Sequence, residues 1–315
     1  MTETKKISLA VVIPTTGRKT LDETLESVLN QSVLPEEIIV FDNSGSNTVK
    51  KESKWRYCPD VQWCYSDEKK DIITSWNTAV SQAKADYTYV LGDDDCMLKD
   101  FVSTVKKQLQ QGYDMLYIPP LYWLKNNQLI DSADSVKIKG KTNFHEFAEN
   151  LLCDEKFPAL LGTIVFSTKV FKKIKGYKSI ITNALAMDHL FHLETAFHSD
   201  RIFAVEKSLW KYRSEVDDWN GRITNSYQTI KLGFQFKKFF SIIKEIFLPN
   251  SAAEKKIFKK YLTSMIQVAF PQQISLLRYF TSLLICFYPY HSISDNIFLL
   301  RSWFYLFRRN FTKNK

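Results

Sequence analysis

This chain of 315 residues lacks the features that mark several large classes of protein. Its five cysteines are odd in number and scattered, with no Cys-x-x-Cys spacing, which argues against a disulfide framework or a zinc site and predicts a reducing compartment. The first apolar run is too short for a signal peptide and ends at Pro14, so we expect a strand there and a protein that stays in the cytoplasm. Neither a repeat nor a low-complexity segment occurs.

Acidic residues are scarce at the C-terminal end. Residues 231–315 hold 14 Lys or Arg against 3 acidic residues, whereas residues 1–230 hold 29 basic and 31 acidic residues. The net charge of +9 therefore comes from the tail, which predicts an anionic partner for that segment. The apolar share of 45% is ample for a core, so the chain is globular and not disordered.

The first hundred residues alternate between strand and helix patterns. The predicted strands lie at 7–14, 36–42, 60–65 and 87–92, and the predicted helices at 21–32 and 71–84. This alternation predicts an α/β fold with a parallel sheet and helices on both sides. Because ligands bind beyond the carboxyl ends of such strands, the polar clusters TTGR, DNSGS and DDD that follow three of them are the candidate site.

The pattern becomes less regular after about residue 113. We expect strands and turns up to about residue 140, a strand running into a short helix over 158–177, and a further helix over 187–199. Residues 201–214 predict a closing β-hairpin or strand pair.

Three adjacent carboxylates, Asp93, Asp94 and Asp95, follow the fourth predicted strand. Like charges repel, so they favour a bound cation or a set of hydrogen-bond donors. A divalent cation held by an Asp-x-Asp pair can neutralise the charge that builds on the diphosphate when a sugar nucleotide is cleaved. Taken alone, the three residues could equally cap a following helix.

The motifs VVIPTTGR, EEIIVFDNSGS, ITSWNTAV and YVLGDDD, in this order and spacing, resemble those of family 2 glycosyltransferases, the inverting GT-A type. The resemblance continues through LLGTIVFS, AMDHLFHLETA and WKYRS and covers roughly residues 7–215. It implies a GT-A domain, with a Rossmann-like, mostly parallel sheet and flanking helices, over residues 1–230. Residues 231–315 would then form a helical C-terminal region.

The resemblance also implies roles for individual residues. Pro14, Thr15 and Thr16 would line the nucleotide cleft, Asp42 would bind the base, Asp93 the ribose, and Asp94 would lie near the sugar. Asp95 would ligate Mn²⁺ or Mg²⁺, Asn77 would contact the nucleotide, and Arg213 would pair with phosphate oxygens beside Tyr212. Asp42 and the residues after it are, by themselves, an ordinary turn sequence.

Two positions depart from the family pattern. The carboxylate that deprotonates the acceptor often stands as Glu-Asp in relatives, and here the pair is Met187-Asp188, which leaves Asp188 as the candidate base. Many relatives carry Arg before Asn in the helix preceding the carboxylates, where this chain has Trp76-Asn77, and Lys69 or Lys70 could replace that arginine. His189 and His192 are secondary candidates for the site, although two packed or solvated histidines are the commoner case.

The basic tail is rich in aromatic residues. Residues 231–250 predict an amphipathic helix with Phe236, Phe240 and Ile243 on its apolar face, and no later stretch reaches the roughly 18 apolar residues that span a bilayer. We expect attachment to an anionic membrane surface. A helical core or dimer interface is the alternative, and RNA binding is disfavoured. Residues 217–219 could form a mobile acceptor loop or a linker.

Together these features predict an inverting, metal-dependent glycosyltransferase. It would move a sugar from a UDP-sugar to a glycan or polyprenyl-diphosphate-linked acceptor, in capsule, O-antigen or lipooligosaccharide synthesis, on the inner face of the cell membrane. It could form a homo-oligomer, and no nucleic acid partner is expected. One alternative is an inactive sugar-nucleotide or membrane-binding scaffold. The other, a sugar-phosphate nucleotidyltransferase, is disfavoured because no glycine-rich phosphate loop follows the first strand.

Overall fold

The computed structural model describes residues 7–124, 126–154, 156–178 and 187–214. All of them belong to one compact unit, formed by residues 1–179 and 186–215, and a second unit holds 180–185 and 216–315. The predicted domain boundary at 230, the loop at 217–219 and the basic tail lie outside the described residues and stay predictions. No helix of the described part is both long and apolar enough to cross a membrane.

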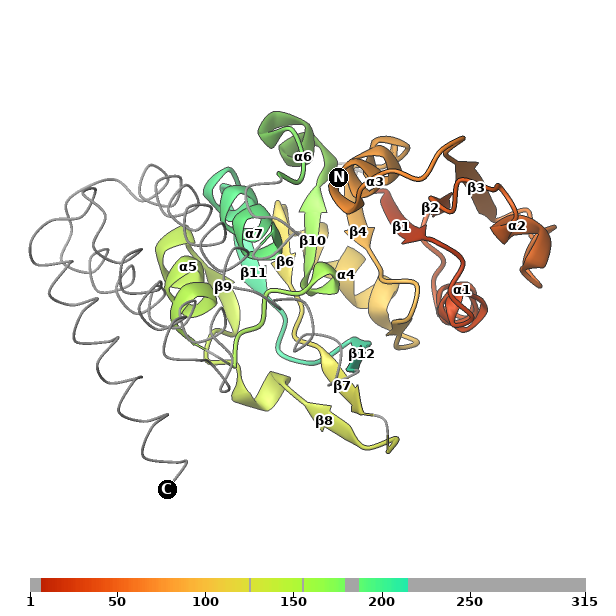
Figure 1. The fold of residues 1–315 in the computed structure, drawn as a ribbon. Helices are drawn as coiled ribbons and strands as arrows, with labels where there is room; N and C mark the ends of the chain where they lie inside the picture. The colour runs from red at the N-terminus through yellow and green to blue at the C-terminus, as the bar shows by residue number, and fades with distance from the viewer. Residues whose placement is uncertain (1–6, 125, 155, 179–186, 215–315) are drawn as a thin grey trace, which may run out of the picture. The chain divides into compact units, whose positions relative to one another are not determined.

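Two sheets organise the described unit (Figure 1). The large sheet contains β1 (Leu9–Thr15), β2 (Glu37–Asp42), β3 (Val61–Tyr65), β4 (Tyr87–Val90), β6 (Met115–Tyr117), β9 (Gly140–Thr142), β10 (Ile164–Ser167) and β11 (Ile202–Ala204). The small sheet contains β5 (Cys96–Met97), β7 (Leu121–Leu124), β8 (Leu129–Asp131) and β12 (Trp210–Ser214).

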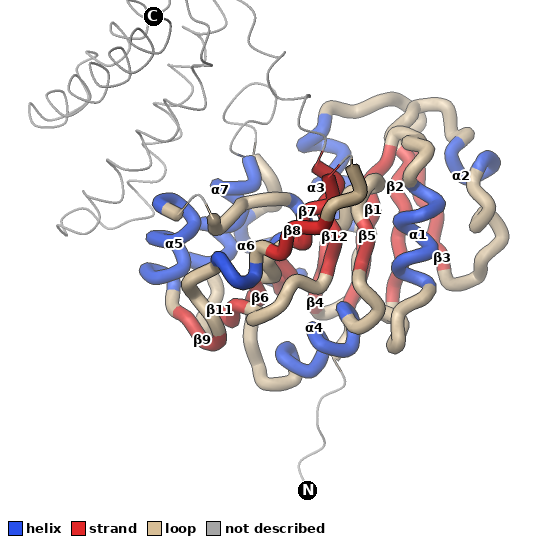
Figure 2. Tube along the Cα trace, turned by 90° about the horizontal axis from the view of Figure 1, so that it is seen from below, coloured by secondary structure: helices blue, strands red, loops and turns tan. Residues whose placement is uncertain are grey.

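Seven α-helices and two short 3₁₀ turns are assigned in the described residues. They are α1 (Leu21–Leu29), α2 (Val49–Glu52), α3 (Ile72–Ser81), α4 (Phe101–Leu109), α5 (Phe144–Cys153), α6 (Thr168–Ile174) and α7 (Met187–Phe197), with η1 (Ala133–Ser135) and η2 (Leu161–Thr163). Helix α3 packs on β1 and β2, α4 on β6, and α6 on β4 and β10, while α5 and α7 pack against each other (Figure 2).

The strand order of the large sheet is β3-β2-β1-β4-β10-β6-β11-β9. Strands β1 to β4 are parallel to one another, whereas β10 runs antiparallel to both of its neighbours and β9 antiparallel to β11. The predicted mixed α/β fold with a mostly parallel sheet is confirmed. All seven residues of β1 are buried, as expected for a central strand that is covered on both faces.

The start of α3 and the buried face of α1 follow from their local sequences. Asp71 is the N-cap of α3, and its carboxylate accepts hydrogen bonds from the backbone N–H groups of Ile73 and Thr74 at 3.0 and 3.1 Å. In α1 the side chains of Leu21, Leu25 and Val28 are buried, which matches the predicted helical spacing.

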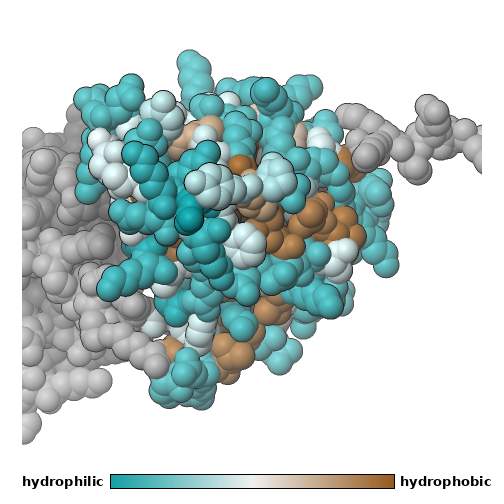
Figure 3. All heavy atoms as spheres, turned by 90° about the vertical axis from the view of Figure 1, so that its right-hand side faces the viewer, coloured by the Kyte–Doolittle hydropathy of each residue, from teal (hydrophilic) through white to brown (hydrophobic). Residues whose placement is uncertain are grey.

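Figure 3, which faces the side carrying β3 and α2, shows mostly hydrophilic side chains with small apolar patches between them.

Three expectations were wrong or incomplete. β11 and β12 do not form a hairpin, because β11 pairs with β6 and β9 in the large sheet and β12 with β5 and β7 in the small one. Asp93–Asp95 do not cap a helix, since strand β5 follows them directly. Helix α5 was not anticipated, although Asn143 caps it by accepting a hydrogen bond from the backbone N–H of Glu146 at 3.0 Å.

The strand order creates a switch point beside β1. From β1 the chain first moves outward to β2 and β3, and then returns to pair β4 with the other side of β1. Connections then leave β1 and β4 in opposite directions, and in open α/β sheets ligands bind in the crevice outside the carboxyl ends of the strands at such a point. The candidate residues Thr15 and Asp93 lie at this crevice.

Candidate active site

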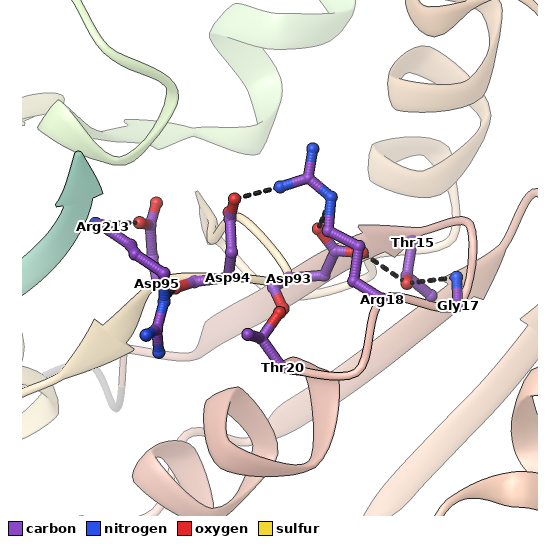
Figure 4. Close-up of polar contacts among 8 residues, drawn as sticks. All are labelled: Thr15, Gly17, Arg18, Thr20, Asp93, Asp94, Asp95 and Arg213. Atoms are coloured by element: carbon purple, nitrogen blue, oxygen red, sulfur yellow. Dashed lines mark hydrogen bonds and ion pairs between the residues drawn. The ribbon is translucent and has the colours of Figure 1, made fainter. Parts of the chain in front are cut away.

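The crevice is bridged by a short hydrogen bond between β1 and the loop after β4 (Figure 4). The Thr15 hydroxyl donates to Oδ2 of Asp93 at 2.6 Å, and the backbone N–H of Gly17 donates to the same hydroxyl at 2.9 Å. The Thr20 hydroxyl, just before α1, donates to the Asp93 carbonyl at 2.8 Å. The predicted residues Thr15 and Asp93 are therefore brought together, and the TTGR loop holds the aspartate loop in place.

Arg18 extends across the first two aspartates (Figure 4). Its Nε lies 3.5 Å from Oδ1 of Asp93, and its Nη1 forms an ion pair with Oδ2 of Asp94. The arginine side chain is 57% exposed, so a solvent-accessible positive charge faces two carboxylates. The predicted residues did not include Arg18, although it stands in the TTGR motif directly after the first strand.

Asp95 is tied to the last described strand. Its Oδ1 accepts a hydrogen bond from the backbone N–H of Arg213 at 2.9 Å, and Nε of Arg213 donates to the carbonyl of Asp94 at 2.9 Å. The guanidinium also donates to Glu23 of α1 at 2.7 Å and lies 4.0 Å from the ring centre of Trp123. In this structure Arg213 therefore clamps the aspartate loop, and its predicted pairing with phosphate stays a prediction.

Two carboxylates lie close to Gly92. A Cβ atom at this position would lie 2.8 Å from Oδ2 of Asp95, closer than real Cβ contacts, and 3.0 Å from Oδ1 of Asp94, which is tighter than most of them. Oxygens of two carboxylates thus converge above the glycine, and oxygens are the ligands that Mg²⁺ and Mn²⁺ prefer. Among the described residues, no group of three or more His, Cys, Asp and Glu is arranged to hold a metal ion.

The charges of this cluster are costly without a counter-ion. Burial, and then the negative charge of Asp94, raise the pKa of Asp95 well above its ordinary value, although its hydrogen bond from Arg213 acts in the other direction. Burial also raises the pKa of Asp93, against the effects of Thr15 and Arg18. A bound cation would offset these repulsions, so the residues fit a divalent metal in their charge and in their oxygen chemistry.

Asp188 lies in different surroundings, in the first turn of α7. Burial raises its pKa to about 7, and among the described residues no charged neighbour contributes to that rise. Within the described residues, Oδ1 of Asp188 is buried without a hydrogen-bond partner. A carboxylate with a pKa near neutrality and a free oxygen can accept a proton, as the predicted general base must.

The two histidines of α7 are packed into the fold. His192 is fully buried, its Nε2 lies 2.7 Å from the hydroxyl of Thr163, and its Nδ1 contacts the carbonyl oxygen of Asp188. Burial lowers the pKa of His189 to about 4 and that of His192 to about 3, so both rings are neutral at pH 7. His192 therefore fixes the turn that carries Asp188.

Tyr212 connects the two carboxylate regions. Burial, and then the charges of Asp95 and Asp94, raise its pKa to about 12, with smaller contributions from Tyr122 and Asp188. The charges of the aspartate loop and of the candidate base thus both act on the pKa of this one phenol. The sequence resemblance pointed to Tyr212 only as part of the WKYRS motif.

The other predicted residues are placed as follows. Pro14 is buried in β1 and Thr16 is exposed just after it. The carboxylate of Asp42 accepts hydrogen bonds from the backbone N–H of Ser44 at 2.7 Å and of Val49 at 3.3 Å, so it also stabilises the turn after β2. Contacts of these three residues with a nucleotide stay predictions.

Asn77 is engaged with a distant backbone. Its Nδ2 donates to the carbonyl of Tyr177 at 2.9 Å, and the backbone N–H of Tyr177 donates to its Oδ1 at 2.8 Å. The Tyr177 ring in turn stacks on Phe191 of α7 at 3.9 Å, one turn from Asp188. The amide nitrogen and the amide oxygen of Asn77 thus both hold the backbone of Tyr177, which precedes the candidate base in the chain. The predicted contact of Asn77 with a nucleotide stays a prediction.

The sequence and the fold can now be compared with known proteins. Residues 10–174 match the family described as Glycosyl transferase family 2. A relative from Campylobacter jejuni subsp. jejuni serotype O:2, named GalNAc(5)-diNAcBac-PP-undecaprenol beta-1,3-glucosyltransferase, is 22% identical over 200 residues. That match covers 62% of this chain and 65% of the relative, slightly less than two thirds of its length. EpsE of Bacillus subtilis (strain 168) is 23% identical over 211 residues, which cover 65% of this chain and 72% of EpsE.

Solved structures of TarS from S. aureus share the fold. The structure of TarS 1-349 in complex with UDP-GlcNAc matches with a TM-score of 0.57 at 14% identity, over 96% of this chain and 90% of TarS. The complex with UDP matches with the same TM-score at 15% identity, over 98% of this chain and 92% of TarS. This likeness confirms the GT-A fold.

Proposed function

The chain belongs to glycosyl transferase family 2 and is a glycosyltransferase, and from this premise we propose the reaction that it catalyses. It transfers one sugar from a UDP-sugar to a hydroxyl group of a lipid-linked glycan, with inversion at the anomeric carbon. The carrying observation is the convergence of Thr15, Asp93, Asp94 and Asp95 at the crevice between β1 and β4. The UDP-GlcNAc and UDP complexes of TarS support the donor class, and the name of the Campylobacter relative supports a lipid-linked acceptor.

The donor binds across the carboxyl ends of the strands. Pro14, Thr15 and Thr16 line the nucleotide cleft, Asp42 and Asn77 face the nucleotide, and Arg213 pairs with a phosphate oxygen after release from Glu23. Asp95, with Asp94, would hold Mn²⁺ or Mg²⁺, and the remaining ligands would be diphosphate oxygens and water. When bound, the cation supplies positive charge for the leaving diphosphate.

Asp188 performs the proton transfer. Its carboxylate accepts the proton of the acceptor hydroxyl while that oxygen forms a bond to the anomeric carbon. The bond between the anomeric carbon and the diphosphate oxygen breaks on the opposite side, and UDP leaves with the electron pair. The pKa of about 7 keeps much of Asp188 ionised at neutral pH and still makes it a useful base.

The acceptor places this reaction at a membrane. A polyprenyl-diphosphate carrier lies in the bilayer, so the enzyme would work at the inner face of the cell membrane, in capsule, O-antigen or lipooligosaccharide synthesis. The excess of Lys and Arg in residues 231–315 supports attachment to anionic lipids. This attachment would be peripheral.

Release of UDP tests the function directly. The full chain is incubated with a panel of UDP-sugars, with Mn²⁺ or with a chelator, and UDP is quantified. We expect Mn²⁺-dependent release from one donor, and a fall of about 1,000-fold in kcat for Asp95→Ala, because one group that stabilises the leaving diphosphate is lost.

The matched control is Asp60→Ala, which removes an exposed aspartate just before β3, at the opposite end of the strands from the crevice. This variant should retain wild-type turnover. Metal-independent release, or equal losses in the two variants, would contradict the proposed role of Asp95. The absence of UDP release from every donor would exclude UDP-sugars as the substrate.

A further inference from the structure

The small sheet begins at the aspartate loop and extends away from it. Strand β5 directly follows Asp95 and pairs antiparallel with β12, so that Lys211 lies opposite Cys96. Beyond β12 come β7 and then β8, which is the edge strand of this sheet. Figure 1 shows β12, β7 and β8 as neighbours in this order. The sheet is thus a continuous surface that starts at the candidate metal ligands.

Three side chains form one row across this sheet. Tyr212 of β12 is the register partner of Tyr122 in β7, and Tyr122 is the register partner of Ile130 in β8. Register partners on neighbouring strands project to the same face. We call Tyr212, Tyr122 and Ile130 the tyrosine row. The two tyrosine rings contact each other edge to face, with 5.9 Å between their centres.

One end of the row touches the site, and the other end reaches solvent. The backbone N–H of Arg213, the residue after Tyr212, donates to Oδ1 of Asp95 at 2.9 Å. At the far end Ile130 is 46% exposed, and all three residues of β8 are exposed. Neighbouring strands lie about 4.8 Å apart, so the row extends about 14 Å from the aspartate loop, farther than a single sugar ring requires.

The opposite face of the same sheet is occupied by contacts within the chain. The ring of Trp123 lies 4.0 Å from the guanidinium carbon of Arg213 and 5.3 Å from Nζ of Lys211. Leu129, the register partner of Trp123, is 47% exposed and lies on this opposite face.

On the face with the tyrosine row, Tyr212 also packs edge to face on the buried Trp210, with 6.0 Å between the ring centres. Tyr122 and Tyr212 are each only partly buried, so parts of both rings stay accessible to a ligand beside the exposed Ile130.

We propose that the tyrosine row is the acceptor platform, which binds an oligosaccharide next to the hydroxyl that reacts. Tyrosine suits this task because its ring packs against the C–H faces of sugars while its hydroxyl bonds to theirs. The continuity of the row with Asp95 and the length of the row favour an oligosaccharide over a monosaccharide. This inference rests on the proposed function and specifies its acceptor class.

Glycan binding without turnover tests the platform. The full chain, saturated with UDP and Mn²⁺, is applied to an array of bacterial and synthetic oligosaccharides, and the best ligand is titrated by calorimetry. We expect the wild type to bind a glycan of at least two sugars. Tyr122→Ala and Ile130→Ala should weaken this binding about tenfold and a few-fold, respectively, because each removes apolar contact area.

Matched variants separate the platform from a general defect. Leu129→Ala changes an apolar residue of nearly equal exposure on the other face and should leave glycan affinity unchanged. Tyr122→Phe retains the ring and should keep most of the affinity that Tyr122→Ala loses. Melting temperatures identify any variant that fails to fold. If Tyr122→Ala fails to fold, the glycan affinities of Ile130→Ala, at the exposed edge, and Leu129→Ala are compared instead.

Three outcomes would overturn the proposal. In the first, the wild type binds no oligosaccharide. In the second, Ile130→Ala and Leu129→Ala lose equal amounts of glycan affinity. In the third, the variants bind glycans like the wild type but lose binding to phosphatidylcholine vesicles that contain phosphatidylglycerol, measured in parallel. The last outcome would make the pair of strands β7 and β8 a membrane contact. If glycans bind as expected but no UDP-sugar releases UDP, the donor assignment fails and the platform stands, because the array needs no turnover.

Discussion

The two carboxylate regions of the site are built in opposite ways. Asp93, Asp94 and Asp95 lie among donors and charges, including Thr15 and Arg18. Asp188 instead lies in the first turn of α7, and within the described part of the chain its Oδ1 is buried without a hydrogen-bond partner. Carboxylates are buried in both regions, but charged and hydrogen-bonding partners act on them only in the aspartate loop, as far as the described residues show.

The causes of the raised pKa values explain what each region can do. In Asp95 the charge of Asp94 adds to the effect of burial, and a cation would cancel that repulsion. For Asp188, burial is the cause of the raised pKa within the described residues. The comparison teaches that one region is suited to holding positive charge and the other to accepting a proton.

The largest effect is expected for Asp188→Asn. Because an amide cannot accept the proton, kcat should fall by about 1,000-fold while donor binding changes little. Turnover is measured as UDP release with acceptor present. The matched control is Asp134→Asn, which alters an acidic residue in η1 and should retain activity. If Asp188→Asn retained the wild-type kcat, Asp188 would not be the base.

The same substitution should raise stability. The pKa of Asp188 is raised from 3.8 to about 7, so the unfolded chain loses this proton at lower pH than the folded protein. Ionisation therefore costs stability progressively between those two values and fully above pH 7. Asp188→Asn should melt a few degrees higher than wild type above pH 7 and equally below pH 4. A melting difference independent of pH would contradict the desolvation of Asp188.

The pH dependence of turnover provides the next test. The ionised carboxylate is the active form, so kcat/KM should fall about tenfold per pH unit below pH 7 and level off above it. His189 and His192, with pKa values of about 4 and about 3, and Tyr212, with one of about 12, do not titrate on this limb. The pKa values of Asp93 and Asp95 are also raised, so the profile is measured at saturating Mn²⁺, which keeps both carboxylates ionised. A flat profile between pH 5 and 8 would exclude Asp188 as the base.

A smaller effect is expected for Asn77→Ala, which removes both hydrogen bonds to Tyr177. If Asn77 acts by positioning Asp188, kcat should fall about tenfold and the apparent pKa of turnover should shift, with little change in KM for the donor. Thr78→Ala, on the same helix, removes a bond to the Thr74 carbonyl and should do neither. A rise in donor KM alone would instead support the nucleotide contact predicted for Asn77.

The smallest effect is expected for Arg18→Ala. Exposed ion pairs are worth about 0–1 kcal/mol, so removing the arginine from Asp93 and Asp94 should strengthen apparent Mn²⁺ binding by at most about fivefold. Calorimetric titration with Mn²⁺ in the absence of nucleotide measures this change. Lys54→Ala, which breaks an exposed pair with Glu26, is the control. Weaker Mn²⁺ binding in Arg18→Ala would show that the arginine supports the metal site.

Much of the N-terminal half followed from local pattern. Short apolar runs and amphipathic helical spacing predicted β1 to β4, α1 and α3, because these elements bury side chains with a regular period. The position of Asp93 after a buried strand was predicted for the same reason. Asn77 shows the limit of such reasoning, since its partner Tyr177 lies 100 residues away and no local signal marks that pair.

What the sequence by itself determined is the set of elements and the chemistry available at their ends. Only the tertiary structure decided that β12 pairs in the small sheet, that Arg213 holds the aspartate loop, and that the charges of Asp95 and Asp188 both act on Tyr212. The physical reason is that strand pairing across 100 or more residues depends on which surfaces remain to be buried once the local elements have formed. Local propensity carries no information about that choice.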